Sequence, residues 1–325
     1  MSEQARGAAL RSWLFVPGDS ARKQEKALAT DADALILDLE DSVDPAQLPA
    51  ARAQVSGLLQ AHPAGAGPEL WVRINAPSGA AWRADLQAVF GLAHGGRGGA
   101  GAGGGRTPDG VVLPKVSAPA EIVSVAGHLA TLEARGGGAG RVTRLLIIAT
   151  ETPAGLLALP QYPAVLGSSR VVMTHLAGLT WGAEDLGTAL GALGRRDSAG
   201  ALTFSFQLAR STCLLAAAAL GVQAIDGVQA DFRDARGLEA ELTAARRDGF
   251  SGKLAIHPDQ IGAINAAFTP TEAEREHARR VVAAFAGAGT GGVASLDGQM
   301  IDRPHLIQAQ RVLAAPAARP KRASG

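Results

Sequence analysis

Short apolar segments of β-type composition alternate with longer helical patterns along most of the chain. Eight such segments occur, and each is an almost unbroken apolar run: 13–16, 34–39, 70–74, 110–113, 144–149, 171–176, 224–228 and 253–256. Runs of this kind are typical of parallel strands that are buried on both faces. Repeating strand and helix eight times favours an α/β fold of the (β/α)8 TIM-barrel type over an open doubly wound sheet. Sequence alone leaves the closure of the sheet open.

The helical patterns between these segments have clear boundaries. They cover 21–29, 45–59, 119–134, 204–220 and 238–247. Asp44 followed by Pro45 is typical of a helix start, with proline at the first helical position. Two more helices, 259–266 and 271–286, are predicted after the eighth strand. A glycine-rich break then leads to a stretch at 293–313 that ends the ordered chain.

These patterns predict three parts. Residues 1–268 form the catalytic TIM barrel, and residues 269–313 form a C-terminal helical extension. The extension packs on the barrel or reaches a neighbouring subunit. Residues 314–325 are rich in alanine, proline and arginine, and we expect them to be a disordered tail.

Composition excludes several classes of partner. The formal net charge is +1, which gives no sign of nucleic acid or an anionic membrane as a partner. Cys213 is the single cysteine, so no intrachain disulfide can form, as is usual in a reducing compartment. Residues 1–9 lack the apolar core of a signal peptide, and no apolar run approaches the ~20 residues of a membrane span. We therefore expect a cytoplasmic protein.

A glycine-rich segment at 95–105 contains Gly96, Gly98 and Gly101 in the spacing of a dinucleotide-binding fingerprint. That fingerprint requires a strand before it and a helix after it. Here a helical pattern precedes the glycines and a strand follows them. We interpret the segment as a flexible surface loop.

Polar residues follow seven of the eight predicted strands. They are Asp38, Glu40, Asp41, Arg73, Asn75, Lys115, Glu151, Glu184, Asp185, Asp231 and His257. Because a TIM barrel carries its catalytic groups at the C-terminal ends of its strands, these side chains should converge on one mouth. Several carboxylates beside an arginine and a lysine suggest Mg²⁺ and an anionic substrate. For any single acid, capping a helix or pairing with Arg73 or Lys115 is an equally good explanation.

Seven motifs occur in an order that resembles a known group of enzymes. They are Arg11–Gly18, Asp38–Val43, Arg73–Asn75, Glu151–Gly155, Gly182–Leu186, Ile256–Ile261 and Met300–Pro304. In this order the chain resembles the citrate lyase beta-subunit-like group of the HpcH/HpaI aldolase/citrate lyase superfamily. The resemblance runs from about Arg11 to Leu313. Each motif alone is weak, but the ordered set is highly specific for the superfamily and less so for a substrate.

This resemblance implies a TIM barrel that forms trimers or dimers of trimers and binds Mg²⁺ through Glu151 and Asp185. Arg73 would hold a carboxylate or enolate oxygen of the substrate. Glu40 or Asp41 would orient Arg73.

The resemblance also implies an acid/base group from outside the barrel. Asp302 would enter a neighbouring subunit's active site in this role, with Asp297 as a nearby alternative. Coenzyme A would be received by a further set of residues: Arg11, Phe15, Lys23, Lys26, His257 and Pro258.

The implied reaction is the retro-Claisen cleavage of a 3-hydroxyacyl-CoA to acetyl-CoA and an oxo-acid. Malyl-CoA, citramalyl-CoA and citryl-CoA are the candidate substrates. Alternatives are an aldolase for hydroxy-keto acids without CoA, a malyl-CoA thioesterase, a citrate lyase beta subunit that depends on a carrier protein, and a non-catalytic relative. Sequence does not decide which acyl-CoA is used.

Overall fold

The computed structural model describes residues 9–63, 65, 67–91, 106–135, 142–287 and 292–315. The predictions for the N-terminal residues 1–8, for the glycine-rich segment 95–105 and for residues 316–325 of the tail fall outside these residues. Within the described parts, no helix combines the length and the apolar character that a membrane span requires.

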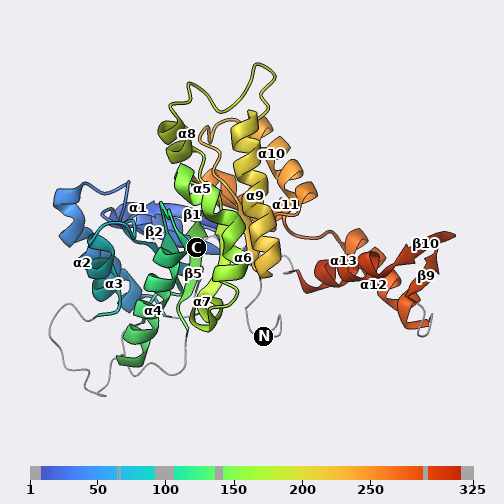
Figure 1. Cartoon of the computed structure of the whole chain (residues 1–325), viewed down its shortest axis with the longest axis horizontal. Helices are drawn as coiled ribbons and strands as arrows, with labels where there is room; N and C mark the ends of the chain where they lie inside the picture. Colours follow the sequence, from blue (N-terminus) through green and yellow to red (C-terminus); the bar gives the residue numbers. More distant parts are fainter. Residues whose placement is uncertain are drawn as a thin grey trace.

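Eight parallel strands close into a barrel, as the sequence predicted (Figure 1). They are β1 Ser12–Pro17, β2 Ala34–Asp38, β3 Glu69–Arg73, β4 Gly110–Leu113, β5 Arg144–Ile148, β6 Leu176–Thr180, β7 Gln223–Asp226 and β8 Gly252–Ala255. Each strand pairs with the next in the chain, and β8 pairs with β1. The closed α/β barrel is thereby confirmed, and the open sheet is excluded.

Helices surround the barrel. They are α1 Ala21–Leu28, α2 Leu48–Ala61, α3 Ala81–Val89, α4 Pro119–Arg135, α5 Pro153–Ala158, α6 Tyr162–Val165, α7 Arg170–His175, α8 Glu184–Leu190, α9 Phe204–Leu220, α10 Ala235–Asp248 and α11 Ile261–Ala267. Short 3-10 turns occur at η2 Pro45–Gln47, η3 Leu159–Gln161 and η4 Pro258–Gln260. Asp44 caps η2 as expected, since its side chain accepts a hydrogen bond from the Ala46 N–H.

The sixth strand was predicted in the wrong place. The apolar run at 171–176 lies mainly in α7, and β6 follows it. Ser169 caps α7 by accepting a hydrogen bond from the Val172 N–H, and His175 at its end pairs with Glu133 of α4 at 3.1 Å. These cap and tertiary contacts override the β preference of the branched residues in the run.

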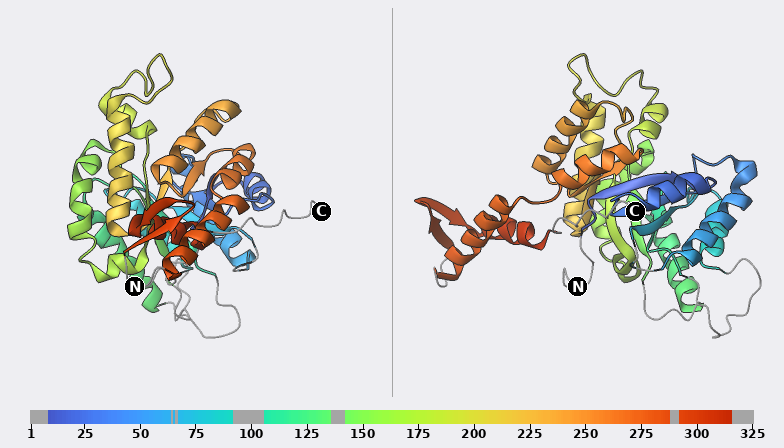
Figure 2. Two further views of the ribbon diagram at one scale, coloured as in Figure 1. Left: turned by 90° about the vertical axis from the view of Figure 1, so that its right-hand side faces the viewer. Right: turned by 180° about the vertical axis from the view of Figure 1, so that it is seen from behind.

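The chain after the barrel forms a separate unit that projects to one side (Figures 1 and 2). It contains α12 Glu272–Gly287, β9 Val293–Leu296, β10 Gln299–Asp302 and α13 Arg303–Ala314. Its own small apolar core includes Val281, Ala294 and Ile301. We refer to residues 272–314 as the extension.

The prediction of a purely helical extension was therefore incomplete. An antiparallel hairpin, β9–β10, precedes the last helix. Asp297 and Gly298 form its turn with φ of 53° and 78°. Asp-Gly is a preferred sequence for such left-handed two-residue turns.

Two tryptophans fill the barrel interior below its mouth. Trp13 and Trp71 meet edge to face with ring centroids 4.7 Å apart, and both are buried. Gly110 on β4 lies against Trp71, because a Cβ at this position would stand 2.2 Å from the indole ring. The interior is thus a packed plug, and the cavity described below opens above it.

This packing predicts the effect of a single methyl group. Gly110→Ala should lower the free energy of unfolding by about 1–3 kcal/mol, because the Trp71 ring must shift. Chemical denaturation followed by fluorescence measures this. Gly127→Ala on α4 is the control: a Cβ there meets no atom within 4 Å, so stability should stay equal or rise. Equal stability of the two variants would contradict the packed plug.

Candidate active site

A cavity of about 850 Å³ opens at the C-terminal ends of the strands. Most of the residues singled out from the sequence line it: Phe15, Lys23, Lys26, Asp41, Arg73, Glu151, Asp185, His257 and Pro258. Glu40 lies beside it through its ion pair with Arg73. The geometry thus confirms that most of the polar strand ends converge on one mouth, but Asn75 and Asp231 are absent from the cavity lining.

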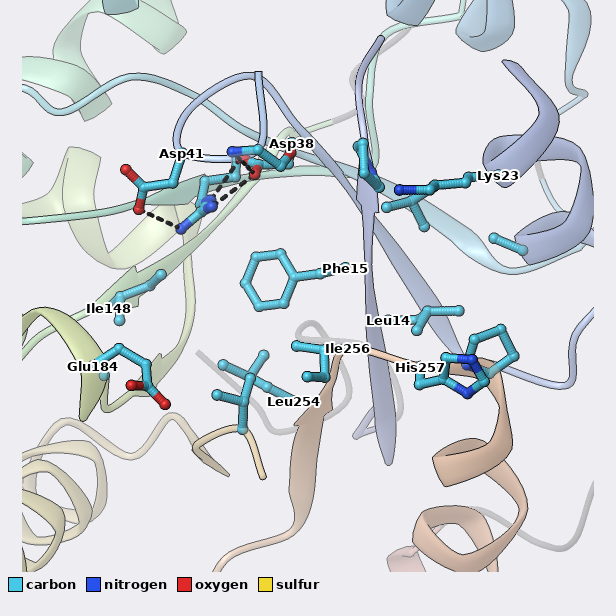
Figure 3. Close-up of a pocket in the computed structure, with 18 of the residues that line it drawn as sticks. Leu14, Phe15, Lys23, Asp38, Asp41, Ile148, Glu184, Leu254, Ile256 and His257 are labelled. Carbon is cyan, nitrogen blue, oxygen red and sulfur yellow. Dashed lines mark hydrogen bonds and ion pairs between the residues drawn. The ribbon is translucent and has the colours of Figure 1, made fainter. Parts of the chain in front are cut away.

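The cavity has two ends of different character (Figure 3). Asp41 and Glu184 lie toward one end, and Lys23 and His257 lie toward the other, with Phe15 between them. Apolar side chains, including Ile148 and Leu254, form the walls. Such a cavity suits an elongated ligand with a small polar head and a distant anionic part.

Arg73 is held rigidly at the acidic end. Its Nε and Nη2 atoms each donate to a carboxylate oxygen of Asp38 at 2.7 Å. Nη1 lies 2.9 Å from Oε2 of Glu40, and the guanidinium stands over the Phe15 ring at 5.0 Å. A bidentate pair fixes both the plane and the position of the guanidinium.

Burial and pairing set the charges of this network. Burial alone would raise the pKa of Asp38, but the hydrogen bonds and charge of Arg73 hold that pKa below its ordinary value. Burial raises the pKa of Glu40, although Arg73 and Lys115 oppose this shift. Asp38 is thus the main partner of Arg73, whereas the sequence pointed to Glu40 or Asp41. Local spacing gave no signal for this pair, because it follows from the β2–β3 register, in which Asp38 and Arg73 are partners.

Glu151 is a buried carboxylate at the end of β5, only 4% exposed. One of its oxygens accepts a hydrogen bond from the Lys115 N–H at 2.5 Å. Burial raises the pKa of Glu151 to about 8, although the Lys115 N–H and the charge of Arg73 act in the opposite direction. Gly182 leaves room for this side chain, since a Cβ there would stand 2.5 Å from its Cγ.

Asp185 shares the cavity with Glu151 and lies in the first turn of α8. Its side chain is 37% exposed and lines the cavity. Across the described residues, no group of three or more His, Cys, Asp or Glu side chains is arranged as a metal site. A pair of carboxylates nevertheless fits Mg²⁺, which retains several waters and commonly uses one or two protein carboxylates. The buried charge of Glu151 is what a divalent cation would neutralise.

Lys115 joins the acids of the mouth. Its ammonium lies 2.6 Å from both Glu40 and Asp41 and 3.7 Å from Asp185. These carboxylates raise its pKa, although burial acts to lower it. Its backbone has a φ of 51°, a left-handed conformation that is uncommon for a residue with a Cβ.

Two predicted residues lie away from this chain's cavity. The guanidinium of Arg11 is buried against Asp33 at 2.8 Å and donates to Thr269 at 2.7 Å. Arg11 precedes β1, at the end of the barrel opposite the mouth, and is absent from the cavity lining, so its assignment to coenzyme A is not supported. Asp302 lies in the extension, where it accepts a hydrogen bond from His305 at 2.6 Å.

Two side-chain contacts at the cavity are not indicated by the sequence. Phe232 stacks on His257 with ring centroids 4.2 Å apart and planes 17° from parallel. Trp181 forms part of the wall, and its indole N–H donates to Asp226 at 2.6 Å. Neither pair is close in sequence, so only the folded chain brings its members together.

A closed barrel with a carboxylate-rich cavity at the C-terminal ends of its strands defines a TIM-barrel enzyme. The profile of the HpcH/HpaI aldolase/citrate lyase family matches residues 11–258. A profile of carbon–carbon bond lyases of the TIM-barrel fold matches residues 208–318. The chain belongs to the HpcH/HpaI aldolase/citrate lyase family, and it is an enzyme of the carbon–carbon lyase type.

Curated relatives carry more than one activity in their names. A (3S)-malyl-CoA thioesterase from Cereibacter sphaeroides is 35% identical, with 94% of this chain and 93% of that protein covered. The citrate lyase subunit beta of Escherichia coli is also 35% identical, with coverage of 96% and 94%.

A solved relative covers almost the whole chain. CitE from Mycobacterium tuberculosis in complex with magnesium, acetoacetate and coenzyme A is 33% identical with a TM-score of 0.67, and 95% of this chain and 98% of that chain are covered. A citrate lyase beta subunit from the same organism, complexed with oxaloacetate and magnesium, has a TM-score of 0.61 at 33% identity, with coverage of 82% and 100%.

The burial of Glu151 predicts a conflict between stability and metal binding. Its folded-state pKa lies above its ordinary value of 4.5, so its contribution to stability is present at low pH and is lost as pH rises from about 4.5 to about 8. Glu151→Gln should therefore raise the melting temperature of the metal-free protein by a few degrees at about pH 9 and change it little at about pH 4.

Thermal denaturation in the presence of a chelator measures this difference. The same variant should lose Mg²⁺ binding in calorimetric titrations. Glu184→Gln, an exposed acid on the same rim, serves as the control and should not be stabilised. A lower melting temperature for Glu151→Gln at about pH 9 would refute the assigned cost of burial.

Proposed function

We propose that this enzyme cleaves a 3-hydroxyacyl-CoA to acetyl-CoA and an oxo-acid in an Mg²⁺-dependent retro-Claisen reaction. The observation that carries the proposal is a long cavity lined by Arg73, Glu151 and Asp185, with Asp41 toward one end and Lys23 and His257 toward the other. Complexes of related CitE proteins with magnesium, coenzyme A and oxaloacetate support it. Malyl-CoA, citramalyl-CoA and citryl-CoA are the candidate substrates.

In this proposal Glu151 and Asp185 hold the Mg²⁺ ion. When bound, the ion would supply a Lewis acid that favours loss of the substrate's hydroxyl proton to solvent as the carbon–carbon bond breaks. Glu151 must be ionised in this role, and the Lys115 N–H and Gly182 keep its carboxylate in position.

Arg73 is the group that would stabilise the negative charge of the departing enolate. Its guanidinium is fixed by Asp38 and Glu40 before the substrate arrives, so little reorganisation is needed as negative charge develops. Asp302 of a neighbouring subunit then protonates the enolate carbon, in a homotrimer or dimer of trimers. Its position in the extension, outside this chain's own cavity, supports supply from another subunit.

The basic end of the cavity is assigned to coenzyme A. Lys23 and Lys26 on α1 offer charge to phosphate groups, and Phe15, His257 and Pro258 complete the lining. The stacked pair of His257 and Phe232 adds a flat aromatic surface at this end.

Thioester hydrolysis is the second candidate, favoured by the similarity to a (3S)-malyl-CoA thioesterase. It would use the same cavity and differ in product, since hydrolysis releases free coenzyme A and a hydroxy acid. Carrier-dependent citrate cleavage, favoured by the similarity to a citrate lyase subunit beta, would release no free acetyl-CoA. Product analysis separates all three.

Removing Asp185 tests the metal assignment. Asp185→Ala should lower kcat for the cleavage of malyl-CoA or citramalyl-CoA by at least about a thousandfold, because one of two metal ligands is lost. A coupled assay for the oxo-acid, with and without Mg²⁺, measures this. Glu239→Gln, on the exposed face of α10, should retain full activity. Unchanged cleavage by Asp185→Ala would refute the assignment of Asp185 as a metal ligand.

Mixing two inactive variants tests the source of the acid/base group. Asp185→Ala and Asp302→Ala should each be inactive alone. Co-expressed, they should regain up to about a quarter of wild-type activity, because random assembly pairs an intact metal site with an intact neighbouring Asp302 in that share of sites. Absence of recovery in mixed oligomers that mass spectrometry has verified would place Asp302 in its own chain's site or remove it from the mechanism.

A further inference from the structure

Lys115 occupies an unusual position among the acids of the mouth. Its backbone N–H donates to Glu151 at 2.5 Å, while its own ammonium lies 3.7 Å from Asp185. One residue thus contacts both carboxylates of the proposed metal pair, one through the main chain and the other through the side chain. The positive φ of 51° directs these two groups into the same cluster, and a non-glycine residue adopts such a conformation only when its surroundings enforce it.

The cluster around Lys115 contains more acidic than basic side chains. It contains five carboxylates and two cations, namely Asp38, Glu40, Asp41, Glu151 and Asp185 with Arg73 and Lys115. Arg73 is bound on three sides by Asp38 and Glu40 and is buried. The Lys115 side chain is 27% exposed and flexible, so of these two cations it is the one that can move.

We propose that Lys115 acts as a built-in competitor of the divalent cation, holding the carboxylates in the metal-free protein and giving up Asp185 when the metal binds. The inference rests on the metal assignment of the proposed function and not on the reaction catalysed. The ligand with which Lys115 competes for the carboxylates is a hard divalent cation such as Mg²⁺.

Distance makes the competition unavoidable. A Mg²⁺ ion bound to Oδ1 of Asp185, at about 2.1 Å, would stand within about 6 Å of the Lys115 ammonium in its present position. Like charges at that separation repel strongly in a partly desolvated site. Glu40 and Asp41, each 2.6 Å away, can retain the ammonium when it leaves Asp185. The main-chain contact to Glu151 is unaffected by that movement.

The consequence is a metal site that is weak until a substrate contributes further oxygen ligands. Without Lys115 the same acids would repel one another and attract a cation more strongly. A purely supporting lysine would have the opposite effect, because its removal would loosen the ligands and weaken the binding of the metal. The sign of the change in affinity therefore separates the two roles.

Calorimetric titration of Mg²⁺, or of Mn²⁺ followed by its paramagnetic resonance signal, into the metal-free full-length protein tests the proposal. Lys115→Met keeps the unbranched stem of the side chain and its Cβ but removes the ammonium and its charge, and it should bind the cation at least about tenfold more tightly. Its melting temperature should fall in chelator and recover at saturating Mg²⁺. Lys115→Gln, which can still donate to Glu40, should show the same gain.

Two controls isolate the charge at this position. Lys115→Arg keeps the charge and should bind Mg²⁺ as the wild type does. Lys23→Met removes a lysine from the opposite end of the cavity and should leave the affinity for Mg²⁺ unchanged.

Equal or weaker Mg²⁺ binding by folded Lys115→Met and Lys115→Gln would overturn the proposal, as would a gain in Lys115→Arg. No substrate is present in these titrations, so a failure of acyl-CoA cleavage leaves the inference standing. A wild-type protein that binds neither cation, with or without an oxo-acid, would overturn both proposals.

Discussion

The ion pair between Arg73 and Asp38 is the interaction on which the active site depends. It follows from the barrel itself, because the parallel register of β2 and β3 sets these two residues side by side. A buried guanidinium without such a partner would be strongly destabilising. With the pair in place, Glu40 can approach from the next turn of the loop, and Phe15 can pack against the guanidinium. The acidic end of the cavity is arranged around this fixed group.

The same mouth holds more acidic than basic side chains, and burial makes their ionisation costly. Glu151 is the clearest case, since burial raises its pKa to about 8. Lys115 offsets part of this excess through Glu40 and Asp41. Strain and uncompensated charge collect at functional sites because the stable scaffold around them can tolerate the cost. Here the scaffold is stabilised by the packed interior beneath the cavity, which Trp13 and Trp71 fill.

The extension is stabilised separately from the barrel. Its hairpin and two helices share a small core of their own, and it projects from the barrel (Figures 1 and 2). Met300 and Val293 on the hairpin are exposed. A segment of this kind can present Asp302 to another molecule without disturbing the barrel. The separate apolar cores of the two parts thus fit the proposed division of the chemistry, with metal and arginine on one chain and the acid/base group on the next.

Sequence by itself determined the class of fold and most of the site. Seven of the eight predicted runs form barrel strands, and most of the polar residues that follow the runs lie at one mouth, as a barrel requires. Tertiary structure decided what local pattern could not. The run at 171–176 became mainly α7 because Ser169 and Glu133 favour a helix there, and Arg11 turned away from the mouth because Asp33 holds it at the other end. The direct pairing of Asp38 with Arg73 depends on the register between β2 and β3, which no local spacing records.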